Sequence, residues 1–259
     1  MTPPAPPGNA ATQSSHRIVL VHGAGHDGSV WNLQADALRS QGYHIFAPDL
    51  PGHGDSFDPA LRDIASMAEW LIDRLRADNW GTTTIAGHSM GSLVALEACA
   101  RAPELFHSLI LVGTAYPMPV APALLQAAKN ETEKAHALIN KWSFASPADE
   151  IDPECPLRAA NLALMRRQAA GVLASDLTAC DAYRGGLEAA SRIRCRCALI
   201  CGALDRMTPP KAAAGLLDAL AANGRDVAMI TLEDSGHSMM SEQPAVLTRT
   251  IRELSVQPT

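Results

Sequence analysis

The sequence predicts an α/β fold in which a mostly parallel, doubly wound sheet carries a helical cap, inserted after the strand that ends near Val112. Short runs of β-branched and other apolar residues alternate with segments of helical periodicity, which is typical of a parallel sheet with helices on both faces. Between residues 115 and 190 this alternation stops, and only helical segments are expected. The 259 residues suffice for one such domain with a large core.

The alternation begins with the run R-I-V-L-V at residues 17–21, a short apolar segment of the kind that forms a buried parallel strand. A helix is expected over residues 31–40, closed by Gly42, and a second strand over residues 43–47. The next helix has the clearest pattern, because its apolar residues recur at helical spacing: Ile64, Met67, Ala68, Leu71, Ile72 and Leu75. Such a stripe predicts a helix that packs against the sheet.

A strand is expected over residues 82–86, a helix over 92–102 that Pro103 stops, and a strand over 106–112. The cap follows over residues 115–190. Its helical pieces are expected at 121–141, 156–170 and 173–190. We therefore expect a disordered leader (1–15), a core made of two parts (16–114 and 191–259), and a cap between those parts (115–190).

The last part of the core repeats the strand and helix pattern. Thr208 and Pro209 are a plausible N-cap and first residue for a helix that ends near residue 222. The strands on either side of it are expected at 197–201 and 227–232. A closing helix should turn four apolar residues inward: Val246, Leu247, Ile251 and Leu254.

Composition excludes several classes of partner. A formal net charge of −6 gives no basic surface, which argues against nucleic acid and anionic membranes as partners. No apolar run is long enough to span a bilayer, and the leader lacks the features of a secretory signal, so we expect a cytoplasmic protein. Cys195, Cys197 and Cys201 lack a partner pair at metal-binding spacing and are expected to pack as small apolar residues, with no metal. No heptad pattern indicates an oligomeric state.

The pentapeptide G-H-S-M-G at residues 87–91 matches the G-x-S-x-G pattern of a nucleophile elbow. An expected strand precedes it and an expected helix follows it, as that turn requires. Glycines two residues either side of Ser89 have a steric reason, since a tight turn from strand to helix leaves no room for a Cβ. The pattern predicts that the Ser89 hydroxyl stands clear of the sheet edge.

A serine hydroxyl needs a base to become a nucleophile, and the base needs a group that orients it. Asp205 and His237 follow expected strands, and the chain order Ser89, Asp205, His237 is the order expected for an elbow serine. Glu233 and Asp234 are also near His237 in sequence, but they belong to a loop, which they are expected to cap or solvate. The sequence therefore predicts Ser89 as nucleophile, His237 as base and Asp205 as acid.

With these motifs in place, the chain resembles the α/β-hydrolase superfamily over residues 16–254. The matching motifs are V-H-G-A-G (21–25), P-D-L-P-G-H-G-D-S (48–56), G-H-S-M-G (87–91), G-A-L-D-R-M-T-P (202–209) and D-S-G-H (234–237). The resemblance implies the same three catalytic roles. An oxyanion hole is expected from the backbone N–H groups of Ala24 and Met90, aimed at the charge that develops on a carbonyl oxygen.

The remaining histidines of these motifs are not needed as bases. His22 is expected to brace its loop, as is Asp49, and for His53 and His88 a structural or pocket-lining role is favoured over proton transfer. The side chains proposed to line a substrate pocket are His26, His88, Trp142 and Met165.

The loop H-G-A-G-H-D-G-S-V-W (22–31) is similar to that of the methyl-esterase and hydroxynitrile-lyase branch of this superfamily. We therefore expect a serine carboxylesterase that cleaves small to medium, largely apolar esters through an acyl-enzyme, with no cofactor. The alternatives are lactone hydrolysis, thioester hydrolysis or cyanohydrin cleavage by the same residues. A ligand-binding protein that kept the fold is a further alternative from another class.

Overall fold

The computed structural model describes residues 17–145, 155–222 and 224–256, so the expected leader lies outside the described residues. Its centre is a sheet of six parallel strands in the order β2-β1-β3-β4-β5-β6. The strands are β1 (Arg17–Val21), β2 (His44–Phe46), β3 (Thr83–His88), β4 (Phe106–Val112), β5 (Arg196–Gly202) and β6 (Val227–Leu232). Each of the six lies where a strand is expected, and the predicted parallel sheet is confirmed.

Both faces of the sheet are buried, because successive residues of a strand point to opposite sides. In β1, Val19 and Val21 belong to one hydrophobic core, while Ile18 and Leu20 belong to the other. Strand β4 divides in the same way. This double burial explains why the strands read as continuous apolar runs rather than as alternating ones.

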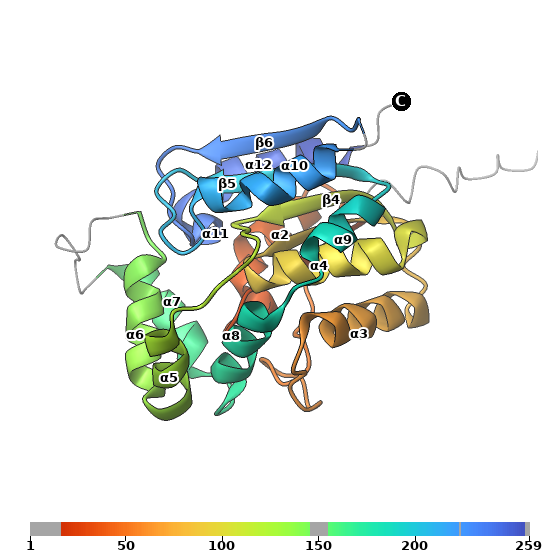
Figure 1. Ribbon diagram of the computed structural model, residues 1–259. Helices are drawn as coiled ribbons and strands as arrows, with labels where there is room; N and C mark the ends of the chain where they lie inside the picture. The colour runs from red at the N-terminus through yellow and green to blue at the C-terminus, as the bar shows by residue number, and fades with distance from the viewer. Residues whose placement is uncertain (1–16, 146–154, 223, 257–259) are drawn as a thin grey trace, which may run out of the picture.

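Helices cover both faces, as a doubly wound sheet requires (Figure 1). One face carries α3 (Ile64–Ala77), α4 (Met90–Arg101), α9 (Gly186–Arg192) and α10 (Ala214–Ala221). The other carries η1 (Gly28–Trp31), α2 (Asn32–Arg39), α11 (Met239–Glu242) and α12 (Pro244–Ser255). Two short 3-10 helices, η2 (Pro103–Leu105) and η4 (Pro210–Ala213), precede β4 and α10.

Helix α3 shows how the sequence sets these elements. Asp63 caps its first turn by accepting a hydrogen bond from the Ser66 N–H at 2.7 Å. Its predicted apolar stripe is buried against the sheet and α4, and Arg74 and Arg76 lie in the last turn, where cations favour the helix dipole. The predicted helix is confirmed.

Four helices between β4 and β5 form a unit that we call the helical insertion: α5 (Pro122–Asn130), α6 (Thr132–Trp142), α7 (Pro156–Arg166) and α8 (Val172–Ala182). They lie beside the end of the sheet toward which the arrows of β4 and β6 point (Figure 1). Their apolar residues form a small core of their own. Ligands of open parallel sheets bind at this end of the strands, so the insertion lies where a substrate would enter.

Two expected helices of this region are each divided in two. The segment expected at 121–141 breaks at Glu131, whose backbone (φ −140°, ψ 56°) is not helical. The segment expected at 173–190 breaks after Ala182, and its second half is α9, which packs against α4 and α10. The predicted boundary of the cap at residue 190 therefore falls inside α9, a helix of the layer that covers the sheet.

Among the helices of the described residues, none combines the length and the apolar character that crossing a membrane requires.

Candidate active site

Ser89 lies at the turn from β3 into α4, as the pentapeptide predicts. Its backbone has φ 52° and ψ −119°, a conformation that costs a residue with a Cβ of order 1–3 kcal/mol. The Ser89 N–H donates to the Val112 carbonyl at 2.9 Å, and its carbonyl accepts from the Ser92 hydroxyl at 2.5 Å. These contacts from β4 and α4 hold the strained turn, which leaves the partly exposed side chain on a cavity wall.

The two elbow glycines have no room for a side chain. A Cβ on Gly87 would lie 2.0 Å from the Gly91 carbonyl oxygen, and a Cβ on Gly91 would lie 2.4 Å from the His22 carbonyl oxygen. Both obstacles are backbone atoms, which cannot move aside as a flexible side chain does. The steric reason inferred for this motif is therefore present in the structure.

Replacing Gly87 by Ala should destabilise the fold by about 1–3 kcal/mol, because the new methyl group overlaps backbone atoms. The matched control is Gly215→Ala in α10, where a Cβ meets nothing within 4 Å. That change should stabilise the protein by about 0.5–1 kcal/mol, since alanine favours a helix over glycine. Urea unfolding of both variants measures the difference, and equal stabilities would contradict the clash.

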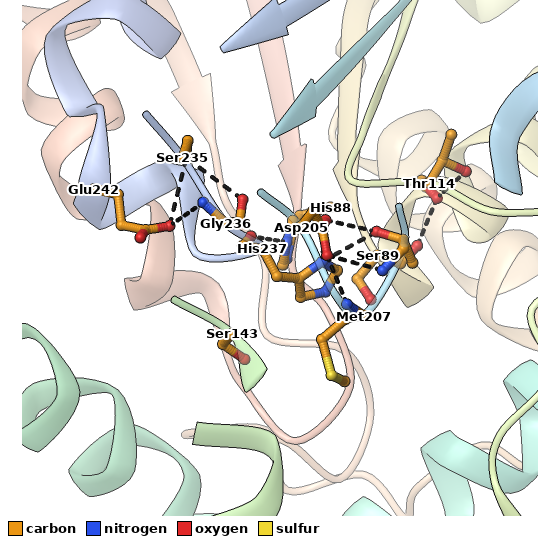
Figure 2. Close-up of polar contacts among 12 residues, drawn as sticks. His88, Ser89, Thr114, Ser143, Asp205, Met207, Ser235, Gly236, His237 and Glu242 are labelled. Carbon is orange, nitrogen blue, oxygen red and sulfur yellow. Dashed lines mark hydrogen bonds and ion pairs between the residues drawn. The ribbon is translucent and has the colours of Figure 1, made fainter. Parts of the chain in front are cut away.

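His237 and Asp205 come together from the loops after β6 and β5. The imidazole Nδ1 donates to Asp205 Oδ2 at 2.8 Å, which leaves Nε2 as the nitrogen that can act as the base. Figure 2 shows Ser89 on one side of His237 and Gly236 with Glu242 on the other. The structure thus brings Ser89, Asp205 and His237, far apart in the sequence, to one place.

Four hydrogen bonds converge on the Asp205 carboxylate. Besides His237, it accepts from the N–H groups of Met207 and Thr208 and from the Thr208 hydroxyl, each at 2.8 Å. Burial raises the pKa of Asp205, but the charge of His237 and these hydrogen bonds outweigh burial and hold the pKa well below its usual range. Asp205 therefore stays ionised at neutral pH.

Thr208 does not cap a helix, so the prediction of its role is wrong. Its hydroxyl donates to Asp205 and lies 3.1 Å from His237 Nδ1. The following 3-10 helix begins at Pro210, with no side-chain cap. A threonine before a proline is a common signal for the start of a helix. Only the folded chain shows that the Thr208 hydroxyl instead donates to the Asp205 carboxylate.

The loop that carries His237 is braced by Glu242. The Glu242 Oε2 accepts from the Gly236 N–H at 2.8 Å (Figure 2). Its Oε1 accepts from the Ala145 N–H at 2.7 Å. Glu233 and Asp234 are exposed, in agreement with their interpretation as solvated loop residues. Neither is hydrogen-bonded to His237, whereas Asp205 is.

The amides of Ala24 and Met90 are the predicted oxyanion donors. Among the loop and side-chain hydrogen bonds of the described residues, none uses either N–H. Met90 is the first residue of α4, where a helical N–H has no partner within the helix. A Cβ on Gly23, next to Ala24, would lie 3.2 Å from the Ser89 Cβ, so the two loops are in contact.

His22 braces the loop after β1, as expected. Its Nε2 accepts from the Leu50 N–H at 3.1 Å while its Nδ1 donates to the Gly23 carbonyl at 2.9 Å, so the ring is neutral. Burial, together with the nearby His53, lowers the pKa of His22 to about 3. Asp49 braces the adjacent turn as predicted, because it accepts from the N–H groups of Gly28 and Asp55.

His88 is buried beside the ring of His237, with 4.5 Å between the ring centroids. Its Nε2 donates to the His237 carbonyl at 2.9 Å. Burial and the neighbouring His237 lower the pKa of His88 well below its usual range, so it is a neutral support for the His237 loop. This agrees with the structural role favoured from the sequence.

Ser89 and His237 open onto a cavity of about 190 Å³ between the sheet and the helical insertion. Of the predicted pocket residues, His26, His88 and Trp142 line it, and so does Ala24. Met165 does not, because it is fully buried in the core of the insertion. The other lining side chains are mostly apolar and include Met118, Val120, Leu124, Ile139, Leu177 and Met207.

No group of histidine, cysteine and acidic side chains in the described residues is arranged to hold a metal ion. All six cysteines are free thiols, and Cys99, Cys180, Cys197 and Cys201 are buried. The predicted packing of Cys197 and Cys201 in a buried strand agrees with this.

Comparison with known proteins gives relatives that match part of the chain. A (E)-2-((N-methylformamido)methylene)succinate hydrolase from Acinetobacter baylyi is 28% identical over 142 residues, which is 54% of this chain and 49% of the relative. A pimeloyl-(acyl-carrier protein) methyl ester esterase from Nitrosomonas europaea is 36% identical over 97 residues, 38% of this chain and 36% of the relative. The chain thus spans about half or less of the length of these curated relatives.

Solved structures match over almost the whole chain. An esterase from Exiguobacterium antarcticum has a TM-score of 0.83 at 21% identity and covers 94% of this chain and 92% of its own. An enol-lactonase from Burkholderia xenovorans has a TM-score of 0.81 at 23% identity, with 95% and 93% covered. At these identities the likeness shows the fold. The model of the alpha/beta hydrolase family matches residues 18–250, and the chain therefore belongs to that family.

Proposed function

We propose that this protein is a serine hydrolase that cleaves carboxylic esters through an acyl-enzyme. The observation that carries the proposal is the shared cavity: Ser89 on its strained turn and His237, held by Asp205, line one mostly apolar space. A serine, a base and an orienting acid in contact with a substrate-sized cavity are the parts that acyl transfer requires.

In the first half of the reaction, Ser89 Oγ attacks the ester carbonyl carbon and His237 Nε2 takes the serine proton. The tetrahedral intermediate collapses, the ester C–O bond breaks, and the imidazolium gives its proton to the leaving alcohol. The ionised Asp205 stabilises the imidazolium and keeps Nδ1 protonated. In the second half, His237 takes a proton from water as the water oxygen attacks the acyl carbonyl carbon. The second tetrahedral intermediate collapses, the bond to Ser89 Oγ breaks, and the imidazolium returns the proton to Ser89 Oγ, which releases the acid and restores the enzyme.

The carbonyl oxygen carries negative charge in both tetrahedral intermediates. We assign the N–H groups of Ala24 and Met90 to that charge, since both residues adjoin Ser89 in space or sequence and neither amide is otherwise engaged in the loops described. One such donor is worth about 2.7–4 kcal/mol of transition-state stabilisation in enzymes of this kind.

The cavity suits a small, apolar substrate. Apolar side chains form most of its wall, and its volume of about 190 Å³ compares with the roughly 150 Å³ of a dry cavity that binds benzene. An acyl or alcohol group about the size of an aromatic ring or a short alkyl chain fits such a space. We therefore propose short to medium acyl esters as substrates.

A panel of p-nitrophenyl esters, lactones, acyl thioesters and cyanohydrins tests the proposal, with each product identified. We expect hydrolysis of the esters, fastest for short acyl chains. Cleavage of a cyanohydrin to free cyanide without ester hydrolysis would overturn it, and so would tight retention of a ligand with no turnover.

Trp142 should limit the length of the acyl chain, because its partly buried ring lines the cavity. Replacing it by Ala should raise the kcat/KM of octanoyl esters relative to butyryl esters by at least about 10-fold, the discrimination that a methylene or two provides. Phe57→Ala is the control, since Phe57 is fully exposed at 103%. An unchanged ratio in the Trp142 variant would place the acyl chain elsewhere.

A further inference from the structure

Asp176 of α8 is a fully buried acid that joins the helical insertion to two loops of the core. Its Oδ2 accepts from the Gly25 N–H at 2.8 Å and from His53 Nε2 at 2.9 Å. Gly25 belongs to the loop after β1, and His53 belongs to the loop after β2. One carboxylate oxygen therefore fixes both loops against the insertion.

The contacts of His53 favour an ionic pair with Asp176. Its Nδ1 faces carbonyl oxygens, those of Leu50 at 3.3 Å and Pro51 at 3.1 Å, so Nδ1 carries a proton. Its Nε2 lies 2.9 Å from the Asp176 carboxylate, which favours a second proton on the ring. Burial lowers the pKa of His53, but the hydrogen bond and charge of Asp176 outweigh burial, and the pKa is raised.

The peptide unit between Ala24 and Gly25 is held on both sides. Its N–H donates to Asp176, and its carbonyl lies 3.1 Å from His26 Nδ1. The backbone of Gly25 has φ 65°, and a Cβ there would lie 2.9 Å from Leu173 Cδ1, so α8 also packs directly on this residue. With its C-terminal side fixed, Ala24 has little freedom to change the direction of its own N–H.

We propose that Asp176 is a positioning residue of the active site: by holding the Gly25 amide and His53, it sets the direction of the Ala24 N–H toward the substrate oxygen. This inference rests on the proposed function. It makes docking of the helical insertion a requirement for a complete oxyanion hole, because the carboxylate that orients the donor comes from the insertion itself.

Two variants test the role of Asp176. Asp176→Ala removes both contacts and should lower kcat for a short p-nitrophenyl ester by about 10- to 100-fold, less than the full loss of one oxyanion donor. Asp176→Asn should lower kcat less, by about 3- to 10-fold, because it keeps only one of the two contacts. With the amide oxygen in the place of Oδ2, the Gly25 contact is kept, but the carboxylate charge that favours a second proton on His53 is gone and the Nε2 contact is lost. With the amide nitrogen in that place, the Gly25 contact is lost. KM should stay within about 3-fold of wild type, since the donor acts on the transition state.

A second readout separates positioning from stability. A trifluoromethyl ketone adds to Ser89 and places an oxyanion in the site, so its affinity should fall in parallel with kcat in both variants, at temperatures below their unfolding. The matched control is Asp181→Ala on the same helix, which removes a carboxylate that accepts from the Val120 N–H at 2.9 Å. This control should lose stability without a matching loss of kcat.

The outcomes separate the two proposals. If wild type hydrolyses esters and whichever Asp176 variant folds keeps kcat and ketone affinity within about twofold, the inference is wrong and the proposed function stands. If wild type neither turns over an ester nor binds the ketone, the proposed function fails. A variant that only unfolds at lower temperature, with unchanged kcat, gives Asp176 a structural role and also overturns the inference.

Discussion

Replacing Ser89 by Ala is expected to lower kcat/KM for short p-nitrophenyl esters by at least about 10⁴-fold, as removal of the nucleophile does in other serine hydrolases. The attacking oxygen is lost, so His237 has no serine proton to accept and no acyl-enzyme can form. Steady-state kinetics measure the loss of activity, and thermal unfolding measures the stability. The melting temperature should not fall, because the hydrogen bonds that hold the turn use the backbone of Ser89.

Ser40→Ala is the matched control for this change. Its hydroxyl donates to the Ala37 carbonyl at the end of α2, and Ser40 is not among the residues that line the cavity. This variant should keep wild-type kinetics. Near-full ester hydrolysis by the Ser89 variant would remove the residue from the mechanism.

Replacing Asp205 by Asn should lower kcat by about 10³- to 10⁴-fold, because an amide in that place favours the wrong tautomer of His237 and cannot stabilise the imidazolium. Asp234→Asn is the control, since Asp234 is exposed and lies three residues before His237. Its activity should match wild type. Equal losses in both variants would contradict the assignment of Asp205.

Asp205 should also make stability depend on pH. The pKa of Asp205 is lower in the folded protein than the ordinary aspartate value of 3.8, so the residue contributes stability that is present above that value. The contribution is lost as pH falls through the pKa of the folded state. The difference in free energy of unfolding between wild type and the Asp205→Asn variant should therefore be largest near neutral pH and should become smaller toward pH 3. Urea unfolding at several pH values measures this.

The strands and the three predicted catalytic residues could be placed from the sequence because their signals are local. Buried strands are visible in the sequence as apolar runs, and Ser89, Asp205 and His237 each lie within five residues of the end of one. Parallel strands end at the same edge of a sheet, so local order along the chain is enough to bring these ends together. The need for glycine at the two elbow positions could be predicted for the same reason, since a Cβ there would overlap the turn itself and the end of the adjacent strand.

The residues that hold the catalytic loops in place could not be predicted from the sequence, because each of them acts through a contact between segments far apart in the chain. Asp176 lies 151 residues from Gly25 and 123 from His53, and no periodicity links them. Met165 shows the converse: an apolar residue of an amphipathic helix faces either the insertion's core or the cavity, and the sequence does not distinguish these. A cytoplasmic location and the absence of a cofactor stay predictions.

The acyl-enzyme itself can be observed most directly by rapid quenching of wild type with a slowly hydrolysed p-nitrophenyl ester, followed by mass spectrometry of the digested protein. We expect one acyl group per chain, bound to the peptide that contains Ser89, and no such adduct in the Ser89→Ala variant. Hydrolysis without any covalent adduct, or an adduct that remains at another residue in that variant, would contradict an acyl-enzyme on Ser89.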